Sequence, residues 1–223
     1  MVRSRSRPRS ADQFPLIGNH RCLDFVNTES IQRGRRVDLL VTFTDLVAWS
    51  TATHLIGPTE ADAVARRWGN TPAGTRALAE ARRLRARLKD MLEQVVRNQP
   101  VASSTVEAIN AILARHVGRS EIVRSREGFV RRFRVEFRSA GDLLVPVAEL
   151  AADFLCRADL SLARKCENPP CLRYFYDVSK NHTRRWCSMR VCGNRAKVAA
   201  YHRRAMPRAS RTGRTRRSSM RAD

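Results

Sequence analysis

The sequence predicts an α+β fold that is mainly α, in which a helical body with a small β-hairpin precedes a small C-terminal module. Apolar residues recur three or four positions apart through most of residues 13–163, as amphipathic helices require. One segment, residues 121–138, alternates apolar and polar side chains instead, as a strand does. Four of the six cysteines gather within residues 166–192, which indicates a second, separately stabilised unit.

The first part of the body predicts three short helices. Residues 14–28 combine a Gly-Asn turn with a compact apolar set that suits a short buried helix, and residues 42–55 suit a second helix with Leu46, Val47 and Trp49 facing inward. A third helix follows Pro58, for which Thr59 is the expected cap.

A long helix is the strongest local prediction. Thr71 followed by Pro72 is a helix start, and the apolar stripe that follows continues to about Asn98. Pro100 then breaks the chain, and the segment from Ser104 to Glu107 has the form of a capping box for the next helix.

The body ends with a hairpin and a last helix. Glu127-Gly128 is the expected turn beside the alternating segment. Asp142 is the expected cap of a helix over residues 143–163, with Pro146 tolerated in its first turn. Cys22 and Cys156 lie in apolar surroundings, so we expect both to be small buried hydrophobes.

Charge is concentrated at the two ends of the chain. The 223 residues carry a formal net charge of +22, of which 17 Lys or Arg against three Asp or Glu fall in residues 164–223. Residues 1–12, a predicted disordered basic arm, and residues 206–223, a predicted flexible basic tail, contain almost nothing to bury. Such a charge predicts polyanionic partners and says little about fold.

The chain holds no apolar run near the roughly 18 residues that a transmembrane helix needs, and no apolar segment follows the basic N-terminus as in a secretory signal. We therefore expect a cytoplasmic protein without a membrane partner, associated with the nucleoid if it binds DNA. In the reducing cytosol, clustered cysteines serve as metal ligands more often than as disulfides.

The clustered cysteines form two pairs with the same spacing. Four residues separate Cys166 from Cys171, and four separate Cys187 from Cys192. Zinc prefers four such ligands in a tetrahedron, so the pattern predicts one structural zinc ion. Free thiols or two disulfides are the alternative reading.

The residues around the cysteines predict a treble-clef-like zinc finger over residues 164–205. Leu172–Tyr176 and Thr183–Trp186 are the two strands of the expected hairpin, and a helix follows Cys192. Gly193 would allow a tight backbone at the metal, and Asn194 would cap the helix. So small a unit depends on its metal for most of its folding free energy.

The segment from Trp186 through Cys192-Gly193-Asn194-Arg195 closely resembles the CGNR zinc-finger family, whose name is that tetrapeptide. The resemblance runs from Cys166 to about Arg204. Upstream, residues 23–28 (LDFVNT) resemble the signature of the ABATE domain, which is described as a stress-induced transcription regulator and which would occupy residues 13–163. The resemblance implies DNA-binding regulation of transcription in a stress response.

The finger is rich in cations and poor in acids, so we expect it to contact nucleic acid, most simply duplex DNA. The expected contact residues are Arg184, Arg185, Arg190, Arg195, Lys197, Tyr201, Arg203 and Arg204. On a helix, Lys197, Tyr201 and Arg204 would share one face. A merely solvated charged face is the alternative.

The helical body is where a small-molecule effector would bind or a homodimer would form. Asp24, Asn27 and Thr28 cluster beside apolar residues and are the candidate ligand-binding residues, although capping or bridging of helices by Asp24 and Asn27 is the favoured explanation.

Two other functions compete with DNA binding. An RNA-binding or ribosome-associated module could stack bases on Tyr174, Phe175 and Tyr176. A treble-clef nuclease is suggested faintly by Asn194 and His202, but no catalytic constellation accompanies them, so we do not expect an enzyme.

Overall fold

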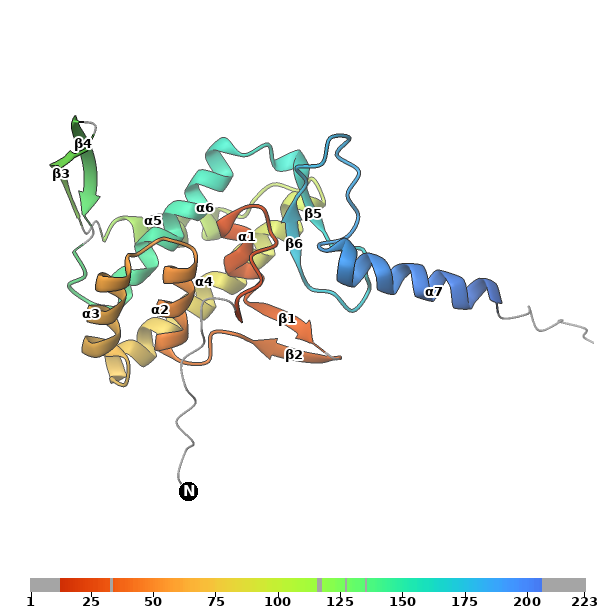
Figure 1. Cartoon of the computed structure of the whole chain (residues 1–223), viewed down its shortest axis with the longest axis horizontal. Helices are drawn as coiled ribbons and strands as arrows, with labels where there is room; N and C mark the ends of the chain where they lie inside the picture. The colour runs from red at the N-terminus through yellow and green to blue at the C-terminus, as the bar shows by residue number, and fades with distance from the viewer. Residues whose placement is uncertain (1–12, 33, 116–117, 127, 135, 206–223) are drawn as a thin grey trace, which may run out of the picture.

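The computed structural model describes residues 13–32, 34–115, 118–126, 128–134 and 136–205, without the side chains of residues 132–134, 203 and 205 (Figure 1). The predicted basic arm and basic tail lie outside these residues. Helices dominate, with three separate two-stranded antiparallel sheets. None of the helices in these ranges combines the length and the apolar character that crossing a membrane requires.

The described elements follow one another in a simple order. They are α1 (Arg21–Val26), β1 (Glu29–Gln32), β2 (Arg35–Asp38), α2 (Phe43–Ala52), α3 (Pro58–Trp68), α4 (Pro72–Val96), α5 (Ser103–Leu113), β3 (Arg119–Ser125), β4 (Gly128–Arg134), η2 (Ala140–Leu144), α6 (Val145–Arg157), η3 (Leu160–Leu162), β5 (Ala163–Lys165), β6 (Tyr174–Tyr176), η4 (Met189–Gly193) and α7 (Asn194–Ala205).

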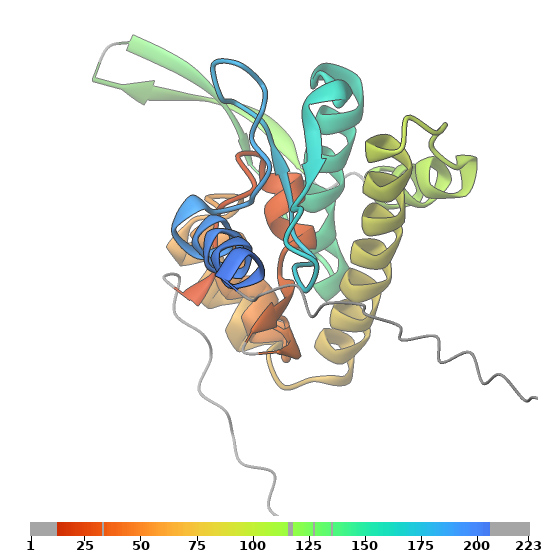
Figure 2. The ribbon, with the colours of Figure 1, turned by 90° about the vertical axis from the view of Figure 1, so that its right-hand side faces the viewer.

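The core forms around α4, which contacts α1, α2, α5 and η2. The apolar stripe read from the sequence is confirmed, since its members are buried: Leu78, Ala81, Leu84, Leu88, Met91, Leu92 and Val95. Thr71 caps this helix by accepting a hydrogen bond from the Gly74 amide, and Pro72 fills its first position, as predicted. The short α1 lies beside α6 (Figure 2), and it contacts both α6 and α4.

The starts of α3 and α5 differ from the prediction. Gly57 is the N-cap of α3, because Pro58 takes the first helical position that its fixed φ suits, and Thr59 lies inside the helix. Helix α5 begins at Ser103 after Ala102 with no side-chain cap, so the predicted capping box at Ser104 is wrong.

The predicted helix over residues 143–163 is shorter. Ser139 is the cap, and Asp142 is the third residue of its capping box, which opens the 3₁₀ turn η2. The α-helix proper, α6, ends at Arg157. Cys22 is buried as predicted, whereas Cys156 near the end of α6 is exposed, which corrects that expectation.

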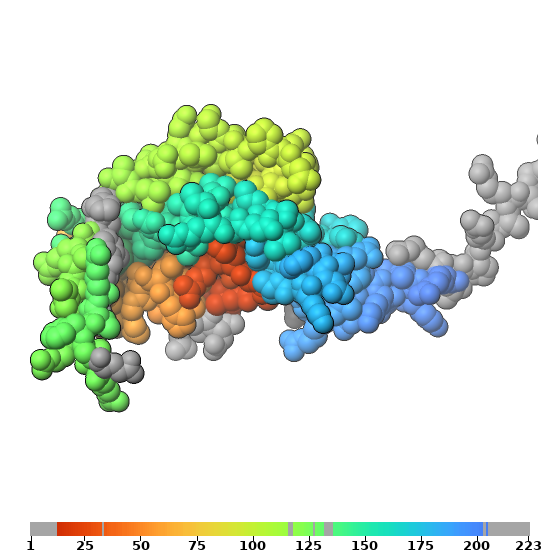
Figure 3. All heavy atoms as spheres, turned by 90° about the horizontal axis from the view of Figure 1, so that it is seen from above, coloured from red at the N-terminus to blue at the C-terminus, as the bar shows by residue number. Residues whose placement is uncertain are grey.

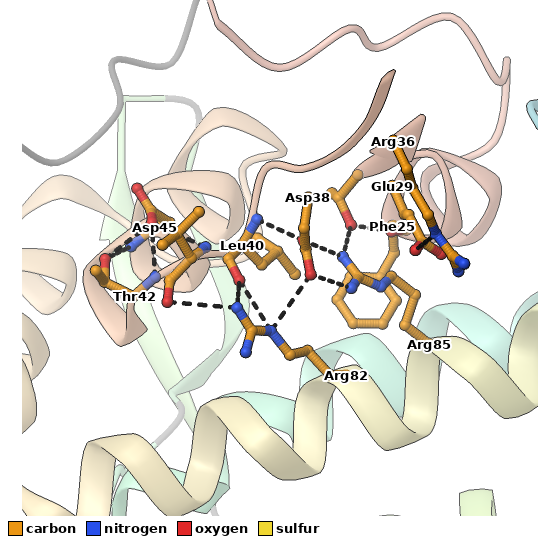
Figure 4. A network of polar contacts seen from close by, with 11 residues as sticks. Phe25, Glu29, Arg36, Asp38, Leu40, Thr42, Asp45, Arg82 and Arg85 are labelled. Atoms are coloured by element: carbon orange, nitrogen blue, oxygen red, sulfur yellow. Dashed lines mark hydrogen bonds and ion pairs between the residues drawn. The ribbon is translucent and has the colours of Figure 1, made fainter. Parts of the chain in front are cut away.

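The β1–β2 hairpin is tied to α4 by an ion-pair network (Figure 4). The Arg85 guanidinium, only 5% exposed, donates to both carboxylate oxygens of Asp38 at 2.7 and 2.6 Å and to the Thr28 hydroxyl at 2.8 Å. One turn earlier, Arg82 pairs with the same carboxylate at 3.3 Å and donates to the Leu40 carbonyl. A buried guanidinium needs such a full set of acceptors.

The alternating segment forms the β3–β4 hairpin, with Val123 paired to Val130 and Ser125 to Gly128. The strand prediction is confirmed, although the second strand ends at Arg134, and Glu127 of the predicted turn lies outside the described residues. The hairpin projects from one end of the molecule, and residues 163–205 form the other end (Figure 3).

The predicted hairpin between the two cysteine pairs is wrong. Residues 183–186 form no strand, and β6 pairs instead with β5, upstream of Cys166. The chain after β6 turns around Asp177, which is fully buried and accepts hydrogen bonds from the Ser179 and Arg184 amides. These bonds satisfy the loop backbone locally, so it needs no strand partner.

Candidate metal centre

Four sulfur atoms meet at the base of α7. The thiols of Cys166, Cys171, Cys187 and Cys192 all lie within 4.8 Å of one another. The Sγ–Sγ distances from Cys187 to Cys171 and to Cys192 are both 3.7 Å. A disulfide would require about 2 Å, whereas ligands about 2.3 Å from one tetrahedral ion lie about 3.8 Å apart. The donor set therefore fits one structural zinc ion.

The first cysteine pair lies in the reversal between β5 and β6. The Cys166 amide donates to the Arg173 carbonyl at 3.0 Å, and the Cys171 amide donates to the Asn168 carbonyl at 2.7 Å. These two bonds close a tight loop through Pro169 and Pro170, which brings both thiols to the same side.

In the second pair, Cys192 lies on the π-helical turn η4 and Cys187 lies two residues before that turn. The Gly193 amide donates to the Ser188 carbonyl, five residues earlier, at 3.0 Å. Such a turn brings residues five apart onto one side, and Cys187 and Cys192 have that spacing. A Cβ on Gly193 would overlap the Met189 sulfur, so a larger residue here would require that exposed, flexible side chain to move. Asn194 is predicted to cap the helix, but it is the first residue of α7, and its side-chain amide donates a hydrogen bond to the Arg190 carbonyl at 3.1 Å.

Hydrogen bonds from the protein reach two of the sulfurs. The Asn168 side-chain amide donates to Cys192 Sγ at 3.4 Å, and the Cys187 amide donates to Cys166 Sγ at 3.4 Å. Each bond links one cysteine pair to the other and stabilises thiolate charge. Sequence reasoning missed Asn168, whose only signal was a polar residue within the first Cys-to-Cys loop.

The thiols compete for protons at this distance. Donation from Cys171 and Cys187 lowers the pKa of Cys166 to about 2, and the same sharing raises the pKa of Cys171 to about 11 and that of Cys187 further. The shared hydrogen bonds therefore favour one thiolate at Cys166. Further thiolates form only when a cation at the centre compensates their negative charge.

The metal centre is joined to the helical body through β6. The Asn27 side chain clamps the Tyr174 backbone, accepting from its amide at 2.9 Å and donating to its carbonyl at 2.8 Å. The Tyr174 ring is fully buried in the body's core, and its hydroxyl donates to Glu93, which also pairs with Lys165. Burial raises the pKa of Tyr174, and the hydrogen bond to Glu93 adds to that effect.

Two of the predicted nucleic-acid contacts serve the finger itself. Arg184 donates to the Trp186 carbonyl at 2.9 Å and to the Cys187 carbonyl, and its guanidinium lies 4.4 Å from the centre of the Phe175 ring. Arg185 is exposed but pairs with Glu167 at 2.6 Å. The Arg184 side chain is therefore committed to the loop that carries Cys187.

The other predicted contacts lie on η4 and α7. Those with described side chains are all exposed: Arg190, Arg195, Lys197, Tyr201 and Arg204. The side chain of Arg203 lies outside the described set. In Figure 1, α7 extends away from the body, and its twelve residues include no acid. Tyr201 is 66% exposed on this helix.

A shallow groove of about 580 Å³ runs along the start of α7. Its floor includes Val191 and Val198, which remain partly exposed, and Arg190 and Arg195 contribute cations to its lining. His202 also lines it, rather than the metal centre.

The aromatic run proposed to stack bases is largely inaccessible. Tyr174 and Phe175 are fully buried, and the Tyr176 hydroxyl accepts a hydrogen bond from the Asp159 amide at 3.1 Å. The observation on which the RNA-binding alternative depended is therefore missing.

The three candidate ligand-binding residues of the body are engaged internally. Asp24 accepts from the Gly18 amide at 2.7 Å, Asn27 clamps Tyr174, and the Thr28 hydroxyl donates to the Phe25 carbonyl at 2.6 Å. These contacts favour capping and bridging roles, and ligand binding by these residues stays a prediction.

Comparison with known families agrees with the two parts of this description. The model of the family ABATE, "Putative stress-induced transcription regulator", matches residues 19–158, and the model of the CGNR zinc finger matches residues 163–205. Neither description names an enzyme. Among curated proteins, no sequence matches the chain.

Proposed function

The chain belongs to the ABATE family and ends in a CGNR zinc finger, and from this premise we propose that it is a zinc-dependent regulator of transcription that binds duplex DNA through η4 and α7. The observation that carries the proposal is the exposed, acid-free helix α7, which starts at the four-sulfur centre. An α-helix, which is about 10–12 Å across with its side chains, fits the major groove of B-DNA, which is about 12 Å wide.

The exposed cations divide between two sides of α7. Lys197, Tyr201 and Arg204 follow one another at helical spacing and suit contacts with phosphates. Arg195 lies with Val198 in the groove, where a cation beside an apolar floor suits the edge of a base pair and a thymine methyl group. The contacts of Lys197, Tyr201 and Arg204 with phosphates would position the helix on the duplex. The contacts of Arg195 and Val198 with base edges would select the DNA sequence.

The zinc ion, when bound, supplies folding free energy and performs no chemistry here. The chain's own residues then fix the start of α7 relative to the body, since Cys192 lies in the π turn that leads into α7 and β6 is clamped by Asn27. We further propose that the helical body senses an effector or forms a dimer, and that DNA binding is coupled to it through this clamp.

The test compares zinc-loaded wild-type protein with Cys187→Ser on a duplex selected from a random DNA library. The four exposed cations Arg190, Arg195, Lys197 and Arg204 predict that log K falls with log salt with a slope of about −4. Cys187→Ser should lose metal and weaken binding by at least about tenfold, because α7 loses its anchor.

Cys156→Ser is the matched control, because Cys156 is exposed and lies outside the cluster. It should keep one zinc per chain and full affinity. Unchanged DNA binding by a metal-free Cys187→Ser protein would refute the finger as the DNA-binding element, and stronger binding to structured RNA in competition would favour the RNA-binding alternative.

A further inference from the structure

The β3–β4 hairpin carries a mixed apolar and cationic face that the metal centre does not explain. Ile122 pairs with Arg131 and Arg124 pairs with Phe129 across the two strands. Because residues two apart on a strand share a face, these four side chains lie together, and we call them the hairpin face.

The apolar side chains of the hairpin face are unusually exposed to solvent. Ile122 is 75% exposed and Phe129 is 71% exposed, and both arginines are exposed as well. A two-stranded hairpin without a covering layer is marginally stable in water. Large apolar side chains so placed mark a surface that binds something.

The charge of the hairpin indicates what that partner is. Its two strands contain five arginines and one acid, Glu121. Among the described residues, Arg124 and Arg131 form no ion pair with an acid: Arg124 lies over the Phe129 ring at 5.5 Å, and Arg131 donates to the Ser120 hydroxyl at 3.0 Å. Arg119, at the start of β3, does pair with Glu136 at 3.4 Å, so it is the two arginines of the hairpin face that are complementary to a polyanion.

We propose that the hairpin face is a second DNA-binding element, which inserts as a β-ribbon into a groove of the duplex that α7 contacts. The major groove admits a two-stranded ribbon as well as a helix. Arg124 and Arg131 then contact phosphates or base edges, while Ile122 and Phe129 lie against sugars and bases. This inference rests on the proposed function, since it assumes the same class of partner.

The position of the hairpin supports a DNA-binding element that is separate from the finger. It projects from the end of the body opposite α7 (Figure 1). Two binding elements joined by one chain raise affinity through effective concentration when one duplex reaches both. A second copy of this chain is the competing occupant, and the experiment separates the two.

The experiment measures the binding of Arg124→Gln/Arg131→Gln to a 30-base-pair duplex over a range of salt concentrations. Loss of two phosphate contacts should make the salt slope less negative by about 2. Arg124→Lys/Arg131→Lys should restore most of the slope, and Phe129→Ser should weaken binding while leaving the slope nearly unchanged. Hydrogen exchange of residues 119–134 should slow when DNA is added.

Arg76→Gln/Arg83→Gln is the matched control, since it removes the same charge from two exposed arginines of α4. If it changes the slope as much as the hairpin variant does, the effect is general electrostatics and the proposal fails. The proposal also fails if DNA leaves exchange in the hairpin unchanged, or if Phe129→Ser instead abolishes a dimer detected by light scattering.

Failure of this inference differs from failure of the proposed function. A hairpin variant with wild-type binding, beside a Cys187→Ser protein that does not bind, overturns the hairpin alone. Binding that survives Cys187→Ser and is lost in the hairpin variant supports the hairpin and overturns the finger.

Discussion

Single buried polar side chains determine how the loops of this molecule fold. Asp177 accepts hydrogen bonds from one hydroxyl and two backbone amides within seven residues of itself, and so converts the chain after β6 into a self-contained loop. Burial opposes the charge of this carboxylate, but the hydrogen bonds lower its pKa below the usual value. For Asp24, burial outweighs the hydrogen bonds, and the pKa of the carboxyl is raised.

Asp24 predicts a stability that falls as pH rises. Burial raises the pKa of its carboxyl to about 6, and the Gly18 and Ile17 amides offset this only in part. The folded state therefore holds a proton between pH 4 and 6 that the unfolded state has released. This contribution is complete below the unfolded pKa and is lost as pH rises through about 6, which costs about 2–3 kcal/mol.

Asp24→Asn should remove this dependence, because the amide keeps an acceptor for the Gly18 N–H and carries no charge. Its stability relative to wild type should increase from pH 4 to pH 6, as measured by denaturant unfolding, and the difference cancels the common effect of zinc release. Asp62→Asn, on the exposed side of α3, should show no such trend. Parallel curves for Asp24→Asn and wild type would contradict the assignment.

Residue-scale predictions from sequence succeed where chemistry alone selects the residue. The four zinc ligands are identifiable because a thiolate set with paired spacing has few other uses in such a chain. Asn168 is not identifiable, because its role depends on reaching Cys192, 24 residues away, and no local pattern encodes that contact. Arg184 misleads for a similar reason: its aromatic and carbonyl partners are set by the folded loop.

At the scale of elements, α4 organises the body and the ion-pair network fixes β1–β2 against it. Burial raises the pKa of Asp38, but the hydrogen bonds from Arg85 prevail and hold it below the usual value. The stability that this carboxylate contributes is thus present near neutral pH and is lost as pH falls.

Asp38→Ala should destabilise the protein by about 3 kcal/mol, because it leaves the buried Arg85 guanidinium without its carboxylate. Denaturant unfolding at pH 7 measures the loss. Asp90→Ala on the exposed side of α4 is the control and should change stability by less than about 0.5 kcal/mol. An equal effect of the two substitutions would mean that the network contributes little.

The elements that the sequence predicts well carry their own start signals or a long period. Helix α4 has both a capping threonine and eight buried apolar positions. Strand β5 has neither, since three residues with two cations show no periodicity, and only its pairing with β6 makes it a strand. The π turn η4 is also not predictable from local sequence. Its wider turn is explained only by the folded structure, in which the sulfurs of Cys187 and Cys192 lie 3.7 Å apart.

At the scale of the whole molecule, the two matched family regions share one core. Ala163 and Tyr174, from the finger, are buried in the same cluster as the body residues Leu23 and Leu92. The body and the finger read from sequence therefore meet in one core, while Cys166, Phe175, Cys187 and Cys192 form a second, smaller cluster of buried residues.

Asn27→Ala should weaken both parts at once. It leaves the buried Tyr174 amide and carbonyl without partners, which costs about 3 kcal/mol. Fluorescence of Trp49 in the body and of Trp186 in the finger should then report one unfolding transition at lower denaturant. Asn110→Ala, on the exposed side of α5, should leave stability nearly unchanged. A transition that moves for Trp186 alone would indicate a finger that undocks independently.

The clamp between Asn27 and Tyr174 joins residues 147 positions apart. During translation, α1 therefore emerges long before the strand that completes its surroundings, and the body must wait for about two-thirds of the polypeptide to follow. Its last core side chain arrives on the segment that also brings the first two thiols. Maturation of the nascent chain thus ends with metal capture and closure of the body as linked events.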